Sequence, residues 1–191
     1  KPATMATYAA YVRDLQAYLR GEVVDQNGFE SRLRWLDQVD IPKVPVDMVA
    51  SGPRSIRIAA ELADRITLAV GVDPERIEWG LQHIREGADA AGRDPGEIPV
   101  GAYVNVSVGE DHAAARDIIK GSAATFAHFS ASAGADFANQ PAIMRTVTEK
   151  LVTEYDTNHH TQGGAPHVQH LSDDFLEWFA AIGSAEAVTD R

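Results

Sequence analysis

The sequence predicts an α/β protein whose strands form a parallel sheet. Three stretches have the apolar, β-branched composition of buried strands, namely residues 44–50, 65–69 and 98–108. The segments between them carry apolar residues at helical spacing. Strands that alternate with helices in this way become parallel neighbours, because each helix returns the chain to the edge where the next strand begins.

The first strand ends in a glycine turn that is suited to binding an anion. Ser51 and Gly52 form this turn, and Pro53 fits the first helical position because its missing N–H would be unpaired there. Gly52 lets the backbone approach a ligand closely, and the amides that open the helix attract negative charge. We therefore infer a candidate phosphate site, since loops at the carboxyl ends of parallel strands hold phosphates in α/β proteins. The alternative is an ordinary turn whose glycine serves only the backbone.

The second strand leads into a similar turn at Val70-Gly71-Val72. Asp73 and Pro74 then start a helix, with an N-cap acceptor and a proline at the first position. The apolar face predicted for this helix consists of Ile77, Leu81, Ile84 and Ala88. Because both glycine turns follow consecutive parallel strands, their tips should lie side by side at one end of the sheet.

The third strand, residues 98–108, alternates valines with Tyr103, Asn105 and Ser107. The face that carries these polar residues points either into a barrel lumen or to solvent at a strand end. Earlier in the chain, Gly21 fits the end of an amphipathic helix, and Asn27-Gly28 predicts a hairpin with a tight primed turn. The aromatic residues of that region, Tyr8 and Trp35, are interpreted as packing residues.

Four histidines lie between residues 159 and 170, in a segment with the composition of a loop. Imidazole is the commonest metal ligand, but this spacing matches neither a helical pair nor a known zinc pattern. We predict a mobile surface or lid loop that holds no metal. The acidic residues 173, 174 and 177 are interpreted as the N-terminus of a helix, where they offset its dipole.

Composition excludes several classes of protein. The chain has 191 residues, of which 45% are hydrophobic, which is sufficient for one packed domain. A formal net charge of -11 argues against a nucleic-acid partner, and the lack of cysteine excludes disulfides and thiolate chemistry. No apolar run approaches the roughly 20 residues that span a bilayer. These features predict a cytoplasmic protein without a membrane partner, and the start at Lys1 suggests a trimmed chain.

An ordered series of short motifs resembles a known family. The motifs are Val44-Pro45-Val46, Ala50-Ser51-Gly52-Pro53-Arg54, the segment 59–65, and the helix ending of residues 84–95. Together they are similar to the luciferase-like monooxygenase superfamily, which includes F420- and flavin-dependent oxidoreductases of the methylenetetrahydromethanopterin reductase type. The resemblance covers most of the chain and is strongest over residues 44–116.

The resemblance implies a TIM (β/α)₈ barrel of the bacterial luciferase-like type. Such a barrel needs about 250 residues, and three strands cannot close one. We therefore expect a partial barrel, in which residues 1–191 form a single domain from its later half and residues 121–183 form a helical insertion and lid region. Residues absent from this chain would complete the barrel, and the protein would form a homo-oligomer. The alternative is a small open α/β sheet that is complete in itself.

The resemblance also implies hydride transfer between a deazaflavin (F420) or flavin cofactor and an organic substrate. Ser51 and Gly52 match the first phosphate-binding turn, and Ala69, Val70, Gly71 and Val72 match the second. Arg54 is a further candidate partner for the phosphate, because Val72 replaces a lysine that some relatives carry. No catalytic residue can be named, and the fragment alone is expected to be inactive. F420 is preferred over FMN; an FMN-dependent monooxygenase and a non-catalytic binding or structural protein are the alternatives.

Overall fold

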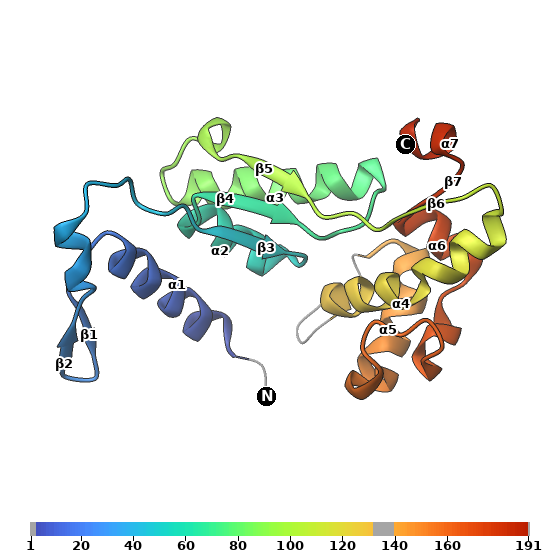
Figure 1. Ribbon diagram of the computed structural model, residues 1–191, viewed down its shortest axis with the longest axis horizontal. Coiled ribbons are helices and arrows are strands. Elements are labelled where there is room, and N and C mark those ends of the chain that lie inside the picture. Colours follow the sequence, from blue (N-terminus) through green and yellow to red (C-terminus); the bar gives the residue numbers. More distant parts are fainter. Residues whose placement is uncertain (1–2, 132–139, 191) are drawn as a thin grey trace.

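The computed structural model describes residues 3–131 and 140–190, which form two lobes (Figure 1). The helices are α1 (Met5–Leu19), α2 (Pro53–Leu62), α3 (Pro74–Ala90), α4 (His112–Ala131), α5 (Ala142–Glu154), α6 (Asp173–Phe179) and α7 (Ala185–Thr189). The strands are β1 (Val24–Gln26), β2 (Phe29–Ser31), β3 (Asp47–Ala50), β4 (Arg65–Leu68), β5 (Val100–Ala102), β6 (Val106–Val108) and β7 (Ala181–Gly183). Short 3₁₀ turns are η1 (Arg34–Gln38), η2 (Pro95–Glu97), η4 (Thr157–His159) and η5 (Pro166–His170). We call α1 to β5 the sheet lobe and β6 to α7 the helical lobe.

The sheet lobe is built on a parallel sheet in the order β3-β4-β5, which confirms the predicted parallel pairing. The strands alternate in burial, so that Met48 and Ala50 of β3 and Ile66 and Leu68 of β4 pack into the core of this lobe. That core also contains buried residues of α2 and α3. The other face of the sheet is open, and Val49 on it is 59% exposed.

Two glycines of α3 allow this helix to pack closely against the sheet and α2. A Cβ atom on Gly80 would lie 2.8 Å from Leu68, and one on Gly87 would lie 2.7 Å from the backbone of Arg57. The buried face of α3 is therefore Arg76, Gly80, Ile84, Gly87 and Ala88. Ile77 and Leu81, which the sequence placed on that face, are only partly buried. The helix is rotated from its expected orientation because the glycines, which have no side chain, permit the closest approach.

Residues 98–108 form two strands, which corrects the prediction of a single third strand. Val100 of β5 pairs with Ile66 of β4, whereas Ser107 of β6 pairs with Ile182 of β7, and both pairings are parallel. The chain changes partner between β5 and β6, where the Asn105 carbonyl accepts a hydrogen bond from the Ala181 amide at 2.9 Å. The strand β7 was not predicted. It pairs with β6 in a two-stranded parallel sheet that is separate from the β3-β4-β5 sheet.

The polar face of β6 packs against a helix. Asn105 and Ser107 are 5% and 7% exposed, and the Ser122 hydroxyl of α4 donates a hydrogen bond to the Asn105 side chain. The alternating residues Val106 and Val108 are 46% and 59% exposed. Because α4 covers this polar face, the face points neither into a barrel lumen nor to solvent, and both predicted alternatives are wrong.

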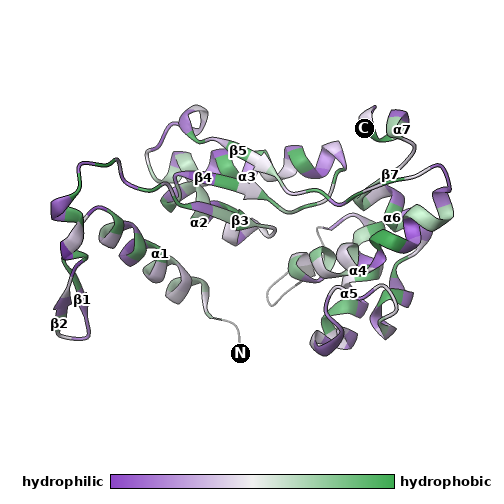
Figure 2. Ribbon diagram, viewed as in Figure 1, coloured by the Kyte–Doolittle hydropathy of each residue, from purple (hydrophilic) through white to green (hydrophobic). Residues whose placement is uncertain are grey.

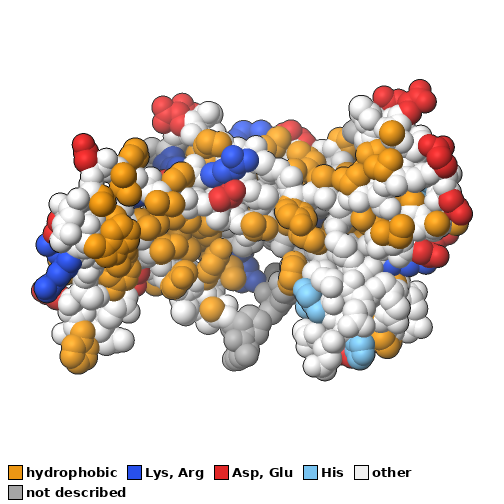
Figure 3. All heavy atoms as spheres, viewed as in Figure 1, with side chains coloured by type: hydrophobic (Ala, Val, Ile, Leu, Met, Phe, Trp, Pro, Cys, Tyr) orange, Lys and Arg blue, Asp and Glu red, His pale blue; other side chains and the backbone are white. Residues whose placement is uncertain are grey.

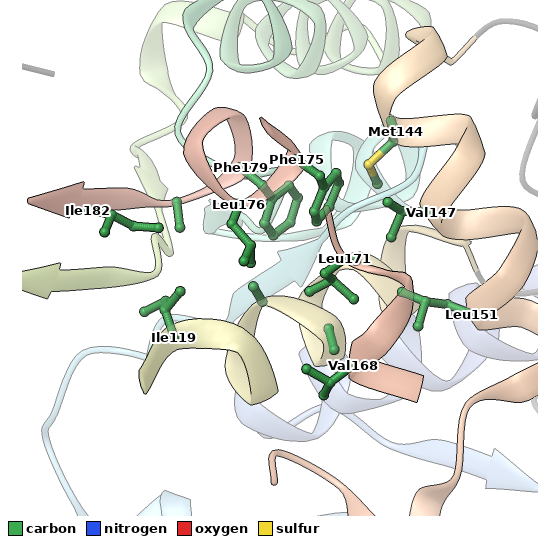
Figure 4. Close-up of a cluster of buried hydrophobic side chains, with 14 of the residues drawn as sticks. Ile119, Met144, Val147, Leu151, Val168, Leu171, Phe175, Leu176, Phe179 and Ile182 are labelled. Carbon is green, nitrogen blue, oxygen red and sulfur yellow. The ribbon is translucent and has the colours of Figure 1, made fainter. Parts of the chain in front are cut away.

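The helical lobe encloses its own core. Phe175 and Phe179 of α6 stack with ring centroids 5.2 Å apart, and both are 0% exposed. Figure 4 shows side chains of α4, α5, η5 and β7 gathered around these two rings. In Figure 2, hydrophobic and hydrophilic residues alternate along α3 and α4, as expected of helices with one buried face. The predicted insertion and lid region, residues 121–183, falls largely in this lobe, although its residues 132–139 lie outside the described part of the chain.

The N-terminal elements agree with most of the sequence predictions. Gly21 follows α1 with φ +74°, and the β1–β2 turn has positive φ at both Asn27 and Gly28, as a primed turn requires. Tyr8 packs against the core of the sheet lobe. Trp35 is 57% exposed, so its interpretation as a packing residue is wrong. No helix within residues 3–131 and 140–190 is both long and apolar enough to cross a membrane.

Candidate functional site

The two predicted glycine turns lie next to each other at the carboxyl ends of β3 and β4. Ala50 and Leu68, the last residues of the two strands, are paired in the sheet. The Ala69 amide donates a hydrogen bond to the Ala50 carbonyl at 2.9 Å, which ties the two loops together. The tips that the sequence placed side by side are therefore neighbours in the structure.

The first turn leaves room for a ligand beside Gly52. This residue is the N-cap of α2 with φ −119°, a backbone conformation that any residue can adopt. Among residues 3–131 and 140–190, a Cβ atom there would meet only the Ser55 hydroxyl, at 3.8 Å. Ser55 also closes the cap, because its hydroxyl donates to the Gly52 carbonyl at 2.9 Å and lies 3.3 Å from the Gly52 amide. Neither local sterics nor backbone angles therefore require glycine at position 52.

The second turn is shaped by the helical lobe. Gly71 has φ +93°, and a Cβ atom on it would lie 2.8 Å from the ring of Phe179. The Val72 amide donates a hydrogen bond to the Phe179 carbonyl at 3.1 Å. The Val72 and Ala69 amides are therefore engaged within the protein. The need for glycine at position 71 follows from packing on α6, which sequence reasoning did not detect.

Three amides at these tips remain candidates for binding an anion. Within the described residues, the N–H groups of Ser51, Val70 and Gly71 make no hydrogen bond to another residue. Val70 is 0% exposed, and a buried N–H without an acceptor is costly, so such a group favours an outside partner. Of the six predicted cofactor-binding residues, Ser51, Val70 and Gly71 thus have an N–H without an acceptor among the described residues, and Gly52 offers space.

A charged residue that the sequence analysis missed lies in the first turn of α3, the helix that follows the second glycine turn. Arg76 belongs to the first turn of α3 and is only 5% exposed. Its guanidinium carbon lies 4.0 Å from the centre of the Trp79 ring, in a cation–π arrangement. Burial lowers the pKa of Arg76 to about 10, an effect that the nearby carboxylate of Asp73 partly opposes. At neutral pH the group still carries its positive charge.

The open face of the sheet carries a cluster of polar side chains from β3 and β4. The Asp47 carboxylate accepts hydrogen bonds from the Thr67 hydroxyl at 2.9 and 3.0 Å and lies 3.3 Å from the Arg65 guanidinium. Gly101 on the neighbouring strand leaves space for Arg65, since a Cβ atom there would lie 3.1 Å from the guanidinium. Asp47 and Arg65 begin their strands, so this group is near the amino ends rather than beside the glycine turns.

The amino ends of the strands hold two open grooves and a structural carboxylate. The grooves have volumes of about 600 and 320 Å³, and Asp64 lines the larger. Asp64 accepts hydrogen bonds from the Lys43 ammonium, the Val46 amide and the Gln16 side chain, at 2.5, 2.7 and 3.1 Å. Burial alone would raise the pKa of Asp64, but these hydrogen bonds lower it below its usual value. In barrels this end serves stability, so we do not assign the grooves as the active site.

The histidine segment packs against the helical lobe, and its members have separate partners. His159 contacts Asp156 at 2.6 Å, His160 contacts the Tyr155 hydroxyl at 2.7 Å, and His170 contacts Glu154 at 2.6 Å. His167 is 1% exposed, so a solvated-loop interpretation is wrong for this residue; burial lowers its pKa. Within residues 3–131 and 140–190, no three His, Asp or Glu side chains are placed to hold a metal ion.

Comparison with known proteins identifies the family. The model of the luciferase-like monooxygenase family matches residues 2–191, so the chain belongs to that family. Among curated relatives, the 5,10-methylenetetrahydromethanopterin reductase of Methanolobus tindarius is 29% identical over 113 residues, which cover 59% of this chain and 34% of that protein. The reductase of the same name from Methanopyrus kandleri is 33% identical over 98 residues, or 49% of this chain and 28% of that protein.

Solved structures show the same fold. The F420-dependent tetrahydromethanopterin reductase of Methanopyrus kandleri superposes with a TM-score of 0.59 and 22% identity, covering 95% of this chain and 52% of that one. An F420-dependent secondary alcohol dehydrogenase superposes with a TM-score of 0.69 and 15% identity, covering 100% and 53%. This chain therefore spans about half of these barrels and about a third of the curated relatives. The predicted partial barrel of the luciferase-like type is confirmed.

Proposed function

We propose that the protein is an oxidoreductase that transfers a hydride between a deazaflavin cofactor (F420) and an organic substrate. The observation that carries this proposal is the pair of adjacent turns after β3 and β4, in a chain of the luciferase-like family. Three amides that have no acceptor among the described residues, together with the open space beside Gly52, fit a phosphate group. The titles of two solved neighbours name F420, which favours this cofactor, and FMN is the alternative because it also carries a phosphate on a ribityl chain.

The cofactor, when bound, supplies the hydride chemistry. The amides of Ser51, Val70 and Gly71 would hold its phosphate and so fix its position at the carboxyl end of the sheet. Charge-assisted hydrogen bonds of this kind are worth roughly 1.5–3 kcal/mol each. The role of Ala69 and Val72 is to shape the second turn, since their amides already bind within the protein.

Replacing Gly52 with valine tests this assignment. The side chain would fill the space beside the turn, and we expect the affinity for F420 or FMN to fall by at least about tenfold, or about 1.4 kcal/mol. Because Gly52 has neither a positive φ nor a close neighbour, the variant should fold. Fluorescence titration of both cofactors measures the affinity, and thermal melts control for folding. Unchanged affinity in a folded variant would contradict the phosphate site, and no binding to the natural protein would favour a non-catalytic role.

We also propose that further strands cover the open face of the sheet in the natural protein. Hydrophobic side chains are spread over the face shown in Figure 3, and Val49, Val106 and Val108 are all at least 46% exposed. Exposed apolar patches of this kind mark interfaces or aggregation-prone surfaces. We therefore expect residues 1–191 alone to associate in sedimentation experiments. A stable monomer with one cooperative melt would instead support an open sheet that is complete in itself.

A further inference from the structure

Arg76 is a buried cation for which the described part of the chain supplies no ion-pair partner. Arginine is almost never fully buried unless it is paired, yet this residue is 5% exposed. No carboxylate within residues 3–131 and 140–190 lies within 4 Å of its guanidinium, and its Nε atom has no hydrogen-bond acceptor there. Several more exposed arginines do contact carboxylates within 4 Å, namely Arg13, Arg20, Arg32, Arg57, Arg65, Arg85 and Arg116.

The groups that surround Arg76 compensate its charge only in part. Trp79 offers the face of its ring at 4.0 Å, which stabilises a cation without neutralising it. The Asp73 carboxylate is near enough to influence Arg76, but its Oδ1 atom caps α3 by accepting the Arg76 backbone amide at 3.1 Å. The N-terminus of α3 itself adds a partial positive charge. Asp73 and Glu75 bring negative charge to this end of the helix, but neither carboxylate lies within 4 Å of the buried guanidinium.

A buried charge without a partner destabilises a protein, so its presence indicates a role in binding. The position along the chain suggests which ligand it serves. The amides of Val70 and Gly71 have no acceptor among the described residues. Gly71 precedes Asp73, the N-cap of α3, by only two positions. The cation and the free amides thus flank the same turn at the carboxyl end of β4.

We propose that Arg76 is the cationic group that binds the phosphate held at the turns after β3 and β4. This inference rests on the proposed function, and the ligand class is a flavin or deazaflavin with a phosphate on its ribityl chain, a monoester in FMN and a diester in F420. The amides of Ser51, Val70 and Gly71 supply hydrogen bonds, and Arg76 supplies the countercharge. Trp79 positions the guanidinium and excludes water from one side of it.

The test compares ligands with and without the phosphate, using the natural full-length protein. FMN and riboflavin differ only in the phosphate and form the decisive pair, whereas F420 and its deazaflavin core differ in the phosphate and the tail attached to it. In Arg76→Met we expect the affinity for the phosphorylated member to fall at least about tenfold, while the affinity for the other member changes less than about twofold. Arg76→Lys should recover part of the loss. The matched control is Arg85→Met on the same helix, which removes an exposed charge paired with Glu78 and should leave all affinities unchanged.

Thermal melts separate this role from a structural one. Removing an unpaired buried charge should leave the melting temperature of the ligand-free protein unchanged or raised, whereas loss of a structural contact would lower it. Inorganic phosphate should raise the melting temperature of the wild type and not that of Arg76→Met. Equal losses for both members of a ligand pair, or no loss, would overturn the proposal. If the wild type binds neither cofactor, the proposed function fails. The response to inorganic phosphate then decides the role of Arg76 by itself. If inorganic phosphate does not stabilise the wild type, the proposed role of Arg76 is overturned.

Discussion

The two lobes bury their hydrophobic residues in different ways. The sheet lobe packs helices against one face of β3 and β4, and its other face stays open. The helical lobe packs side chains of α4, α5, η5 and β7 around Phe175 and Phe179, which are both 0% exposed (Figure 4). The sheet lobe thus resembles part of a larger layered structure, whereas the helical lobe has a closed core.

This difference explains where the candidate site forms. The Phe179 ring and carbonyl, which belong to the closed core, contact Gly71 and Val72 at the end of β4. The helical lobe therefore fixes the second turn, while the first turn at Gly52 has open space around it. The helical lobe thus supports one of the two candidate ligand-binding loops of the open sheet.

The largest expected effect comes from removing the centre of the closed core. Phe179→Ala should lower the free energy of unfolding by about 3–5 kcal/mol, because it leaves a cavity in a fully buried cluster. Denaturant unfolding measures the loss. Phe29→Ala, in the 78% exposed tip of the β1–β2 hairpin, is the control and should change stability by less than about 0.5 kcal/mol. Similar small effects at both positions would show that the helical lobe is not a closed core.

The two glycine turns should differ sharply when each receives a methyl group. Gly71→Ala forces a side chain into a left-handed backbone and against the Phe179 ring, so we expect a loss of about 2–4 kcal/mol. Gly52→Ala should change stability by less than about 0.5 kcal/mol, because its backbone is extended and the space beside it is open. Thermal and denaturant melts of the two variants make this comparison. Equal losses would mean that the first turn is packed as tightly as the second.

The smallest effect is a difference between the lobes in acid. The lowered pKa of His167 means that the unfolded chain binds its proton more readily, so stability is fully present above the unfolded value of about 6.5 and falls as pH drops below it. The lowered pKa of Asp64 has its effect at lower pH. The stability that Asp64 contributes is present above about pH 3.9, the pKa in the unfolded chain, and is lost as pH falls through its pKa in the folded protein.

We therefore expect the helical lobe to weaken before the sheet lobe on acidification. NMR signals of α5 and α2 followed between pH 7 and pH 3 would show the order of loss. His167→Gln should reduce the first transition and leave the second, and Asp64→Asn should do the reverse. Simultaneous loss of both sets of signals in the wild type would mean that the lobes unfold as one unit.

Local sequence signals determined much of the fold and part of the candidate site. Pro53 and Pro74 mark helix starts, and Asn27-Gly28 marks the hairpin, because each depends on backbone angles within a few residues. The adjacency of the two glycine turns also followed from the sequence, since consecutive parallel strands end at the same edge. The phosphate-binding role of these turns stays a prediction.

Other features depended on contacts between distant parts of the chain. Residues 181–183 become a strand only because β6 pairs with them, and nothing in three apolar residues between two helices indicates that partner. Gly71 requires its small size because of Phe179, and Arg76 shares the buried face of α3 with Gly80, which packs closely against Leu68. The sequence by itself determined the local elements and their order, because those follow from short-range sterics and hydrogen bonds. Only the tertiary structure decided which strand pairs with β6, which glycine is constrained, and which buried charge has no ion-pair partner among the described residues.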